Sequence, residues 1–186
     1  MFSLAVIVLI LSWLTPLMAF LIKIESKGPV FFSQLRNGYN FKSFNCFKFR
    51  SMVINPKADL IQVSRGDSRI TAIGKFLRKT SIDEMPQFFN VLLGDMSVVG
   101  PRPHMLSHTE MYAKKIDKFM VRHFVKPGIT GLAQVSGFRG EVESDNDIIG
   151  RVKHDVFYIE NWSFFLDLKI IFQTISNSLK GEDKAY

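Results

Sequence analysis

The stretch Thr80-Ser81-Ile82-Asp83-Glu84-Met85-Pro86-Gln87-Phe88-Phe89-Asn90 places two neighbouring carboxylates at the start of an apolar helical run. Ser81 and Glu84 have the spacing of a capping box, in which two side chains satisfy free N–H groups reciprocally. Pro86 argues instead for Asp83 as the N-cap, because proline is tolerated in the first turn of a helix but not in its interior. Both interpretations put the two acids at the positive end of a helix dipole, which favours their charged forms.

Asp83 and Glu84 have different tasks in this arrangement, because adjacent helical side chains point about 100° apart. Alone, such a pair is more often only a helix start. Here Arg78 precedes the pair, and Gly100-Pro101-Arg102-Pro103 follows it, with Arg102 held in extended backbone between two prolines. Acids that bind Mg²⁺ beside guanidinium groups that bind phosphate indicate phosphoryl chemistry.

The composition describes a chain long enough for one domain with a basic surface. Its 186 residues are 47% hydrophobic and carry a net charge of +7. Such a charge suits either nucleic acid or an anionic membrane with anionic substrates. No helix-turn-helix, RNA-recognition or zinc-finger pattern occurs in the sequence, so we expect no nucleic-acid partner. The single Cys46 excludes an intrachain disulfide framework and is typical of a reducing compartment.

Residues 2–22 are almost continuously apolar, and this length is near the roughly 20 residues that cross a bilayer. A signal peptide is not favoured, because no positive segment precedes the run and no cleavage site follows it. Hydropathy alone favours a spanning helix, whereas Thr15-Pro16 in the middle of the run favours a re-entrant helix that bends there. Lys23 and Lys27 then place the remaining chain on the cytoplasmic side.

The pattern beyond the apolar run predicts a small hairpin followed mainly by helices. Asn37-Gly38 is a strong hairpin turn signal, and Lys48 and Arg50 alternate with phenylalanines as if on a solvated strand face. Helices are expected over 105–121 and 147–160, with a third after Asn161. Its apolar stripe suits either a protein core or a helix lying in the membrane interface, and it contains Trp162, Phe164, Phe165, Leu168, Ile171, Phe172 and Ile175.

Several blocks of sequence, in this order, resemble the bacterial sugar transferases of the monotopic phosphoglycosyl transferase family. The blocks are Gly28-Pro-Val-Phe-Phe-Ser-Gln, Lys48-Phe-Arg-Ser-Met, Arg78-Lys-Thr-Ser-Ile-Asp-Glu-Met-Pro-Gln, Gly94-Asp-Met-Ser-Val-Val-Gly-Pro-Arg-Pro, Pro127-Gly-Ile-Thr-Gly and Asp167-Leu-Lys-Ile. Gly137-Phe-Arg-Gly-Glu, Asn161-Trp-Ser and the final Lys-Ala-Tyr are similar to the branch that moves glucose-1-phosphate or galactose-1-phosphate onto undecaprenyl phosphate.

The resemblance implies an α+β, mainly helical, single monotopic membrane-associated domain. Residues 1–22 would form a re-entrant membrane helix, broken at Thr15-Pro16, and residues 23–186 a cytoplasmic catalytic domain with a small β-hairpin and interfacial amphipathic helices. The implied location is the bacterial inner membrane, with the catalytic domain on its cytoplasmic face. Family members usually have a basic amphipathic start before the apolar run, and this branch often has upstream transmembrane helices. Because this sequence begins with Met1-Phe2, we expect a catalytic core or a truncated form.

The implied activity is the transfer of a sugar-1-phosphate, with glucose-1-phosphate first, from a UDP-sugar to undecaprenyl phosphate. UMP is released, and the step begins the synthesis of exopolysaccharide, capsule or O-antigen. Galactose-1-phosphate and N-acetylhexosamine-1-phosphate stay open as alternatives, as does a homo-oligomer. A membrane-anchored, non-catalytic basic binding module is the alternative from another functional class.

The resemblance also assigns roles to individual residues. Asp83 would be the nucleophile that forms a covalent aspartyl phosphosugar and would bind Mg²⁺ together with the diphosphate. Glu84 would help to remove the proton of the acceptor and orient the site. A carboxylate nucleophile splits one phosphoryl transfer into two easier steps, and metal and arginine neutralise the developing charge.

Four more residues complete the expected site. Arg78 and Arg102 are predicted to contact phosphate, because guanidinium groups bind it bidentately. Gln134 and Arg139 are predicted on the nucleotide-sugar side, in a glycine-rich loop region that mixes polar and aromatic groups. His104, His108 and His123 lack metal-ligand spacing, so we expect no zinc site there.

Overall fold

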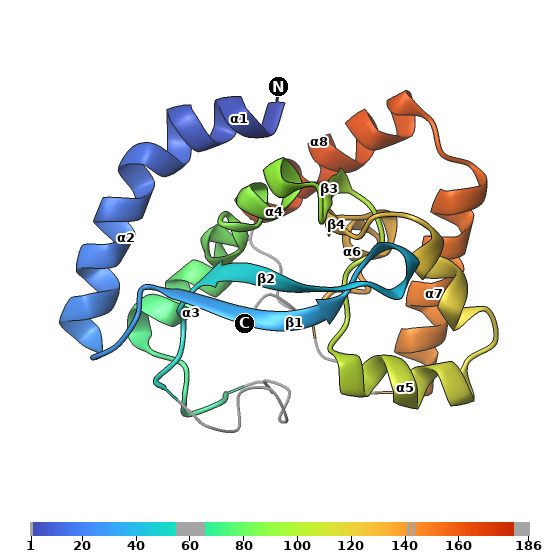
Figure 1. Cartoon of the computed structure of the whole chain (residues 1–186), viewed down its shortest axis with the longest axis horizontal. Coiled ribbons are helices and arrows are strands. Elements are labelled where there is room, and N and C mark those ends of the chain that lie inside the picture. The colour runs from blue at the N-terminus through green and yellow to red at the C-terminus, as the bar shows by residue number, and fades with distance from the viewer. Residues whose placement is uncertain (1, 55–65, 141, 143, 181–186) are drawn as a thin grey trace.

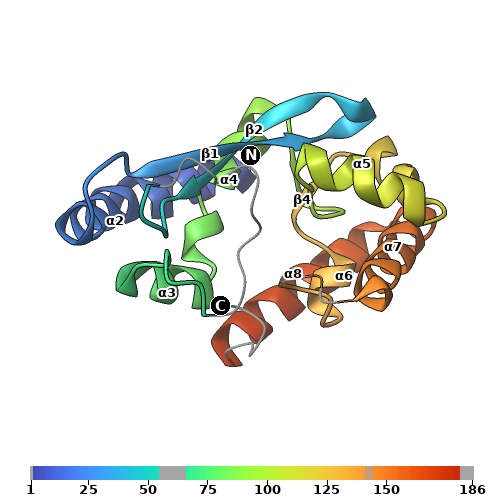
Figure 2. The same ribbon diagram turned by 90° about the horizontal axis from the view of Figure 1, so that it is seen from below.

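The computed structural model describes residues 2–54, 66–140, 142 and 144–180. Helices dominate, with two small two-stranded sheets, which confirms the predicted mainly helical α+β class with a small hairpin. Figure 2 shows α2 and α3 toward one end of the hairpin and α5 and α7 toward the other. The elements are α1 Phe2–Val6, α2 Ser12–Glu25, β1 Phe31–Asn37, β2 Ser43–Phe49, α3 Ala72–Lys79, α4 Gln87–Leu93, β3 Ser97–Val99, α5 Leu106–Lys115, β4 Gly128–Thr130, α6 Leu132–Val135, α7 Asp145–Glu160 and α8 Phe164–Lys180.

The N-terminal apolar segment is helical but bent, and Figure 1 shows α1 and α2 running in different directions. Helix α2 continues through Thr15 and Pro16, so the helix is not broken at the predicted dipeptide. The departure from α-geometry is a π-helical turn, Ile7–Leu11, before α2. Pro16 lacks an N–H, so the carbonyl of Ser12 at the start of α2 loses its helical partner, yet α2 continues through it. The Ser12 hydroxyl donates to the carbonyl of Val8 over 2.5 Å within this widened turn.

One face of this bent helix packs on the rest of the protein and the other is exposed. Leu14, Met18 and Ile22 follow one another at four-residue spacing and are buried against Phe49 and Leu77. The helical run Ser3–Glu25, with a mean hydropathy of 2.5, is long and apolar enough to cross a membrane by length and composition. Its exposed side chains include Leu9, Trp13, Leu17, Phe20 and Ile24.

The predicted hairpin forms, but its turn differs from the one expected at Asn37-Gly38: Gly38 is extended, and the left-handed residues are Asn40 (φ 50°) and Phe41 (φ 62°). Strands β1 and β2 pair antiparallel, from Phe31 opposite Phe49 to Asn37 opposite Ser43. Asn90 of α4 is fully buried against the free edge of β2, where its side chain accepts the N–H of Phe47 and donates to a neighbouring carbonyl. Helix α4 is thereby fixed beside β2, and the acidic residues just before it come under the hairpin.

The second sheet joins the hairpin half to the C-terminal helices. Strands β3 and β4 are parallel, with Ser97 opposite Gly128 and Val99 opposite Thr130. A Cβ atom at Gly128 would lie 2.1 Å from the nitrogen of Gly100, so this close approach requires glycine. The segment that follows β3, with Pro101 to Pro103, therefore starts from a tightly fixed point.

The C-terminal helices agree with the sequence pattern in part. Helix α7 matches the predicted 147–160 closely and begins with a capping box between Ser144 and Asp147. The helix predicted over 105–121 ends earlier, at Lys115, because the chain turns at Lys118 with a positive φ and buries Phe119. The apolar stripe of α8 does not form a core, since these large side chains are exposed: Trp162, Phe164, Phe165, Leu168, Phe172 and Ile175.

Candidate active site

The acidic pair lies in a short 3-10 turn, Ile82–Glu84, between α3 and α4, which we call the acidic turn. Ser81 enters it with left-handed backbone (φ 60°), and neither predicted cap forms, because Glu84 turns toward cations and Pro86 occupies the N-cap of α4. Pro86 has no N–H to donate, which suits the N-cap position of α4, and the acids therefore lie before that helix. The acids are held by tertiary contacts rather than as helix caps.

Glu84 is buried, 6% exposed, and is bound by two cations. Lys48 Nζ lies 2.7 Å from Glu84 Oε1, and Arg102 donates to both carboxylate oxygens, over 3.1 and 2.5 Å. Burial opposes the charge of Glu84, but Arg102 and Lys48 together hold the pKa of this carboxyl well below its usual value. Glu84 is therefore ionised, and the two neighbouring cations balance its charge.

Asp83 is equally buried, with 5% of its surface exposed, but here burial outweighs the effect of the nearby positive charges. Burial raises the pKa of Asp83 above its usual value, and Lys48 offsets only part of this effect. The charged form of Asp83 is thus the less well stabilised of the two. A poorly solvated carboxylate beside cations is what a phosphoryl-transfer nucleophile requires.

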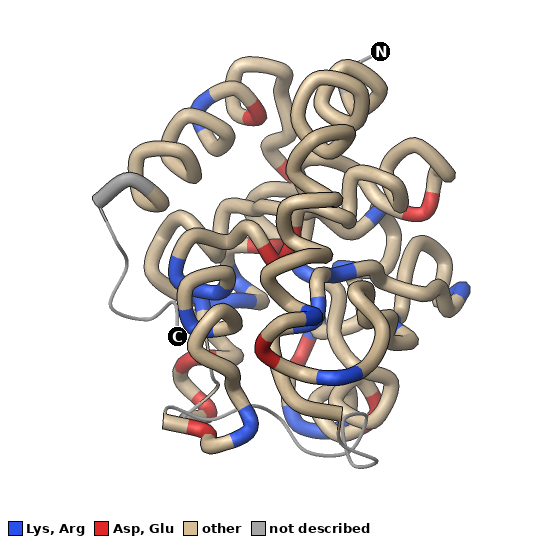
Figure 3. The backbone as a smooth tube through the Cα atoms, turned by 90° about the vertical axis from the view of Figure 1, so that its left-hand side faces the viewer, with Lys and Arg blue, Asp and Glu red and all other residues tan. Residues whose placement is uncertain are grey.

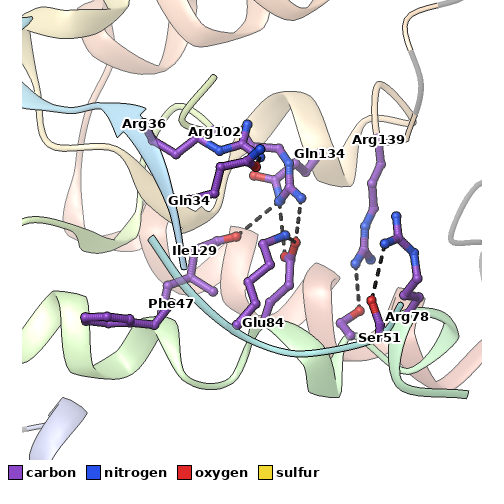
Figure 4. A network of polar contacts seen from close by, with 12 residues as sticks. Gln34, Arg36, Phe47, Ser51, Arg78, Glu84, Arg102, Ile129, Gln134 and Arg139 are labelled. Carbon is purple, nitrogen blue, oxygen red and sulfur yellow. Dashed lines mark hydrogen bonds and ion pairs between the residues drawn. The ribbon is translucent and has the colours of Figure 1, made fainter. Parts of the chain in front are cut away.

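Further cations approach the acidic turn from separate elements. Arg139 Nη2 donates to the hydroxyl of Ser81 over 2.7 Å, and Arg78 lies 3.4 Å from the hydroxyl of Ser51. Figure 4 shows Arg78 and Arg139 next to each other to the right of Glu84, with the Arg102 guanidinium directly above the Glu84 carboxylate. Figure 3 shows acidic and basic segments side by side near the centre of the molecule. Guanidinium groups gathered from distant segments favour an anion such as a diphosphate.

The predicted residues differ in how closely they approach the acidic turn. Arg102 contacts Glu84 directly, while Arg139 reaches the acidic turn through Ser81. Gln134 on α6 instead donates to the carbonyl of Ile129 over 3.2 Å. Its buried Oε1 atom has no hydrogen-bond partner in the described part of the chain, so it has acceptor capacity left for a ligand.

Lys48 and Arg50 were wrongly interpreted from the alternating pattern as a solvated strand face. Lys48 contacts Glu84, and Arg50 is only 6% exposed. Period-two alternation separates two strand faces, but it does not say which of them other elements cover. The position of both cations within one Lys-Phe-Arg block was the available indication that they act together.

Arg50 joins the N-terminal helix to the sheet that carries Lys48. Its guanidinium donates to the carbonyls of Ser26, Lys27 and Pro29 over 2.6–3.2 Å, directly after α2. Glu25 adds a second tie, because its carboxylate accepts N–H groups at the start of α3 over 2.5 and 2.9 Å. The end of α2 is thus fixed relative to the acidic turn.

Asp83 and Glu84 are the carboxylates of the acidic turn, and the Glu84 oxygens are already in contact with Arg102 and Lys48. Among the described residues, no group of three or more His, Cys, Asp or Glu side chains is arranged to hold a metal. Mg²⁺ commonly binds one or two carboxylates and takes its other ligands from substrate phosphates and water. Asp83 therefore fits a metal shared with a diphosphate substrate better than a metal caged by protein alone.

Comparison with known proteins identifies a family and several similar sequences. The profile of the bacterial sugar transferases matches residues 1–181. The UDP-glucose:undecaprenyl-phosphate glucose-1-phosphate transferase of Klebsiella pneumoniae is 51% identical over 92% of this chain and 37% of that protein. The enzyme of that name from Escherichia coli K12 is 46% identical over 91% of this chain and 37% of its own length. The undecaprenyl-phosphate galactose phosphotransferase of Salmonella typhimurium is 40% identical over the whole chain and 41% of its own length. The chain thus spans little more than a third of these relatives.

Proposed function

Because the chain belongs to the bacterial sugar transferase family, we propose that it transfers glucose-1-phosphate from UDP-glucose to undecaprenyl phosphate with release of UMP. Names of relatives support glucose in several cases and galactose in one of those described above. The observation that carries the proposal is the asymmetry of the acidic turn, where a buried Asp83 with a raised pKa lies beside the charge-neutralised Glu84. The step would begin the assembly of exopolysaccharide, capsule or O-antigen.

The reaction proceeds in two phosphoryl transfers at Asp83. Its carboxylate oxygen attacks the phosphorus that carries the sugar, the P–O bond to the UMP oxygen breaks, and UMP leaves with that electron pair. The resulting aspartyl phosphosugar is then attacked by a phosphate oxygen of the lipid acceptor, which restores the carboxylate and yields the diphosphate-linked sugar. Arg102, Arg78 and Arg139 stabilise the charge that develops on the transferred phosphate.

Glu84 has a supporting role in this scheme. Its pKa lies well below the usual value, so it is a weak base. A phosphate monoester acceptor is largely deprotonated at neutral pH and needs little help from a base. Orientation of Lys48 and Arg102 is thus the role that its contacts support better than removal of the acceptor's proton. When bound at Asp83 and the diphosphate, Mg²⁺ neutralises phosphate charge.

The proposal includes a monotopic arrangement at the cytoplasmic face of the inner membrane. A re-entrant N-terminal helix is supported by the bend before α2 and by the exposed apolar face of that helix. The exposed stripe on α8, with Phe165 and Phe172, supports contact with the membrane interface. Lys23, near the end of α2, supports a cytoplasmic location for the residues after it.

The direct test is UMP release by the purified protein with UDP-glucose, undecaprenyl phosphate and Mg²⁺. Asp83→Asn should abolish release, and incubation of wild type with donor alone should add the mass of a sugar phosphate to the protein. Because a raised folded-state pKa means that the charged carboxylate is disfavoured, Asp83→Asn should keep or raise the melting temperature at neutral pH. Wild-type turnover in this variant would overturn the nucleophile assignment, and absence of UMP release from wild type with any UDP-sugar would favour a binding module.

A further inference from the structure

A second arginine–carboxylate pair lies behind the active-site arginine. Arg122, in the 3-10 segment Phe119–Phe124, and Asp155 of α7 form an ion pair of 2.6 Å between Nη2 and Oδ2. Their side chains are 4% and 3% exposed, and the guanidinium also lies over the ring of Phe119, 5.2 Å from its centroid. No substrate can reach a pair so deeply buried, so any role in catalysis has to be exerted through other residues.

Arg122 holds the segment that carries Arg102. Its Nη2 atom donates to the backbone carbonyl of Arg102 over 2.9 Å, and Nη1 lies 2.9 Å from Nε2 of His104. Burial and the charge of Arg122 lower the pKa of His104 well below its usual value, so this imidazole is neutral and its Nε2 accepts the hydrogen bond. The Arg122 guanidinium therefore contacts the residues on both sides of Pro103.

The two prolines beside Arg102 explain why this segment needs the contacts of Arg122. Pro101 and Pro103 have no N–H groups, so around Arg102 the backbone is fixed largely through its carbonyls. The Pro101 carbonyl accepts from the N–H of Gly128 over 2.9 Å, and the Arg102 carbonyl accepts from Arg122. These two contacts fix the peptide from which the Arg102 side chain reaches Glu84.

We propose that Arg122, with its charge balanced by Asp155, is a positioning residue that sets where the Arg102 guanidinium meets Glu84 and the donor diphosphate. This inference rests on the proposed function, in which Arg102 contacts that diphosphate. Lysine cannot replace Arg122, because only the planar guanidinium donates to His104 and to the Arg102 carbonyl at once while its charge lies against Asp155.

The experiment is a double-mutant cycle on UMP release by the full chain with UDP-glucose and undecaprenyl phosphate. Arg122→Lys should lower kcat/KM roughly 10- to 100-fold, the effect expected when a charged group is misplaced by about 1 Å. In an Arg102→Gln background the same substitution should change kcat/KM less than about twofold, because the group being positioned is already absent. A residue that only stabilises the fold would cause the same loss in both backgrounds.

Two further variants keep the test decisive. Ser144→Ala removes the N-cap of α7, the helix that carries Asp155, and should leave kcat/KM unchanged below its melting temperature. If Arg122→Lys does not fold, Asp155→Asn keeps an acceptor oxygen of the same shape and should show the same dependence on the Arg102 background. Equal losses in both backgrounds, or no loss, would overturn the positioning role alone. Wild-type kinetics for Arg102→Gln would overturn both this role and the proposed phosphate contact.

Discussion

The Arg102–Glu84 and Arg122–Asp155 pairs are made of the same chemical groups but are differently exposed. The Arg102 side chain keeps 31% of its surface in solvent, whereas both members of the inner pair are at or below 4%. An arginine that reaches solvent can exchange a carboxylate for a phosphate when substrate arrives. Arg122 is too deeply buried for such an exchange, so it can only hold neighbouring residues in position. Exposure, rather than residue type, separates the binding group from its support.

The carboxylates of the two pairs show the same contrast. Burial raises the pKa of Asp155 despite the nearby charges of Arg122 and Arg151. For Glu84 burial acts in the same direction, but Arg102 and Lys48 outweigh it and lower the pKa. Desolvation can thus exceed the attraction in a sealed pair, which is why removing one partner of it is so destabilising.

The largest stability effect is expected when the inner pair is broken on one side. Asp155→Ala leaves the charge of Arg122 buried without its carboxylate, and we expect a loss of about 3–5 kcal/mol in the free energy of unfolding. Denaturant titration followed by circular dichroism measures this loss. The double variant Asp155→Leu with Arg122→Met removes both charges and should recover most of it. A loss for Asp155→Ala below about 1 kcal/mol would contradict the buried-pair interpretation.

Substitutions around the more exposed Arg102–Glu84 pair should change the pH dependence of activity rather than the stability of the fold. Lys48→Gln removes a cation that lowers the pKa of Asp83, so this already raised pKa should rise further. Because the proposed nucleophile reacts as the carboxylate, kcat/KM falls as the pH drops through this pKa, and the acid limb should move to higher pH. UMP release measured over roughly pH 5 to 9 gives the profile.

Lys42→Gln is the matched control for this measurement. Lys42 is exposed on the same hairpin, so its loss should leave the acid limb where it is. An acid limb in Lys48→Gln that stays in place or moves to lower pH would show that Lys48 does not act on the nucleophile.

The fold was predictable where a local pattern determines it. Asn37-Gly38 indicated where the hairpin turns, but the left-handed backbone of the turn falls at Asn40 and Phe41 rather than at that dipeptide. Helix α7 was found by its amphipathic pattern, but its start was predicted at Asp147 instead of Asp145, because the capping box of Ser144 with Asp147 was not recognised. The early end of α5 was missed, because the burial of Phe119 in a tertiary cluster overrides a helical pattern that continues to Val121.

The site was predictable only in its local parts. The acidic pair and the rigid Arg102 segment stand out by residue type and spacing, and the structure brings Arg102 onto Glu84. The contact of Arg122 with the Arg102 segment could not be predicted, because Asp155, which pairs with Arg122, lies on another helix and no sequence period links the two residues. The role of Lys48 depended on which strand face α4 and the acidic turn cover, and this is a tertiary property.

A third arginine–carboxylate pair differs from the other two in being local in sequence rather than joining distant elements. Asp67 accepts from Arg69, two residues further along, over 2.5–3.1 Å, and this hydrogen bonding lowers the pKa of Asp67 to about 2. Asp67→Asn should reduce the free energy of unfolding by less than about 1 kcal/mol at neutral pH, because Arg69 can turn toward water. A lowered folded-state pKa contributes stability above the unfolded pKa and loses it as the pH falls toward about 2, so the difference between wild type and variant should shrink with acidification. Thermal melting at neutral and acidic pH measures it. A loss as large as that of Asp155→Ala would contradict the expectation that this local pair contributes little to stability.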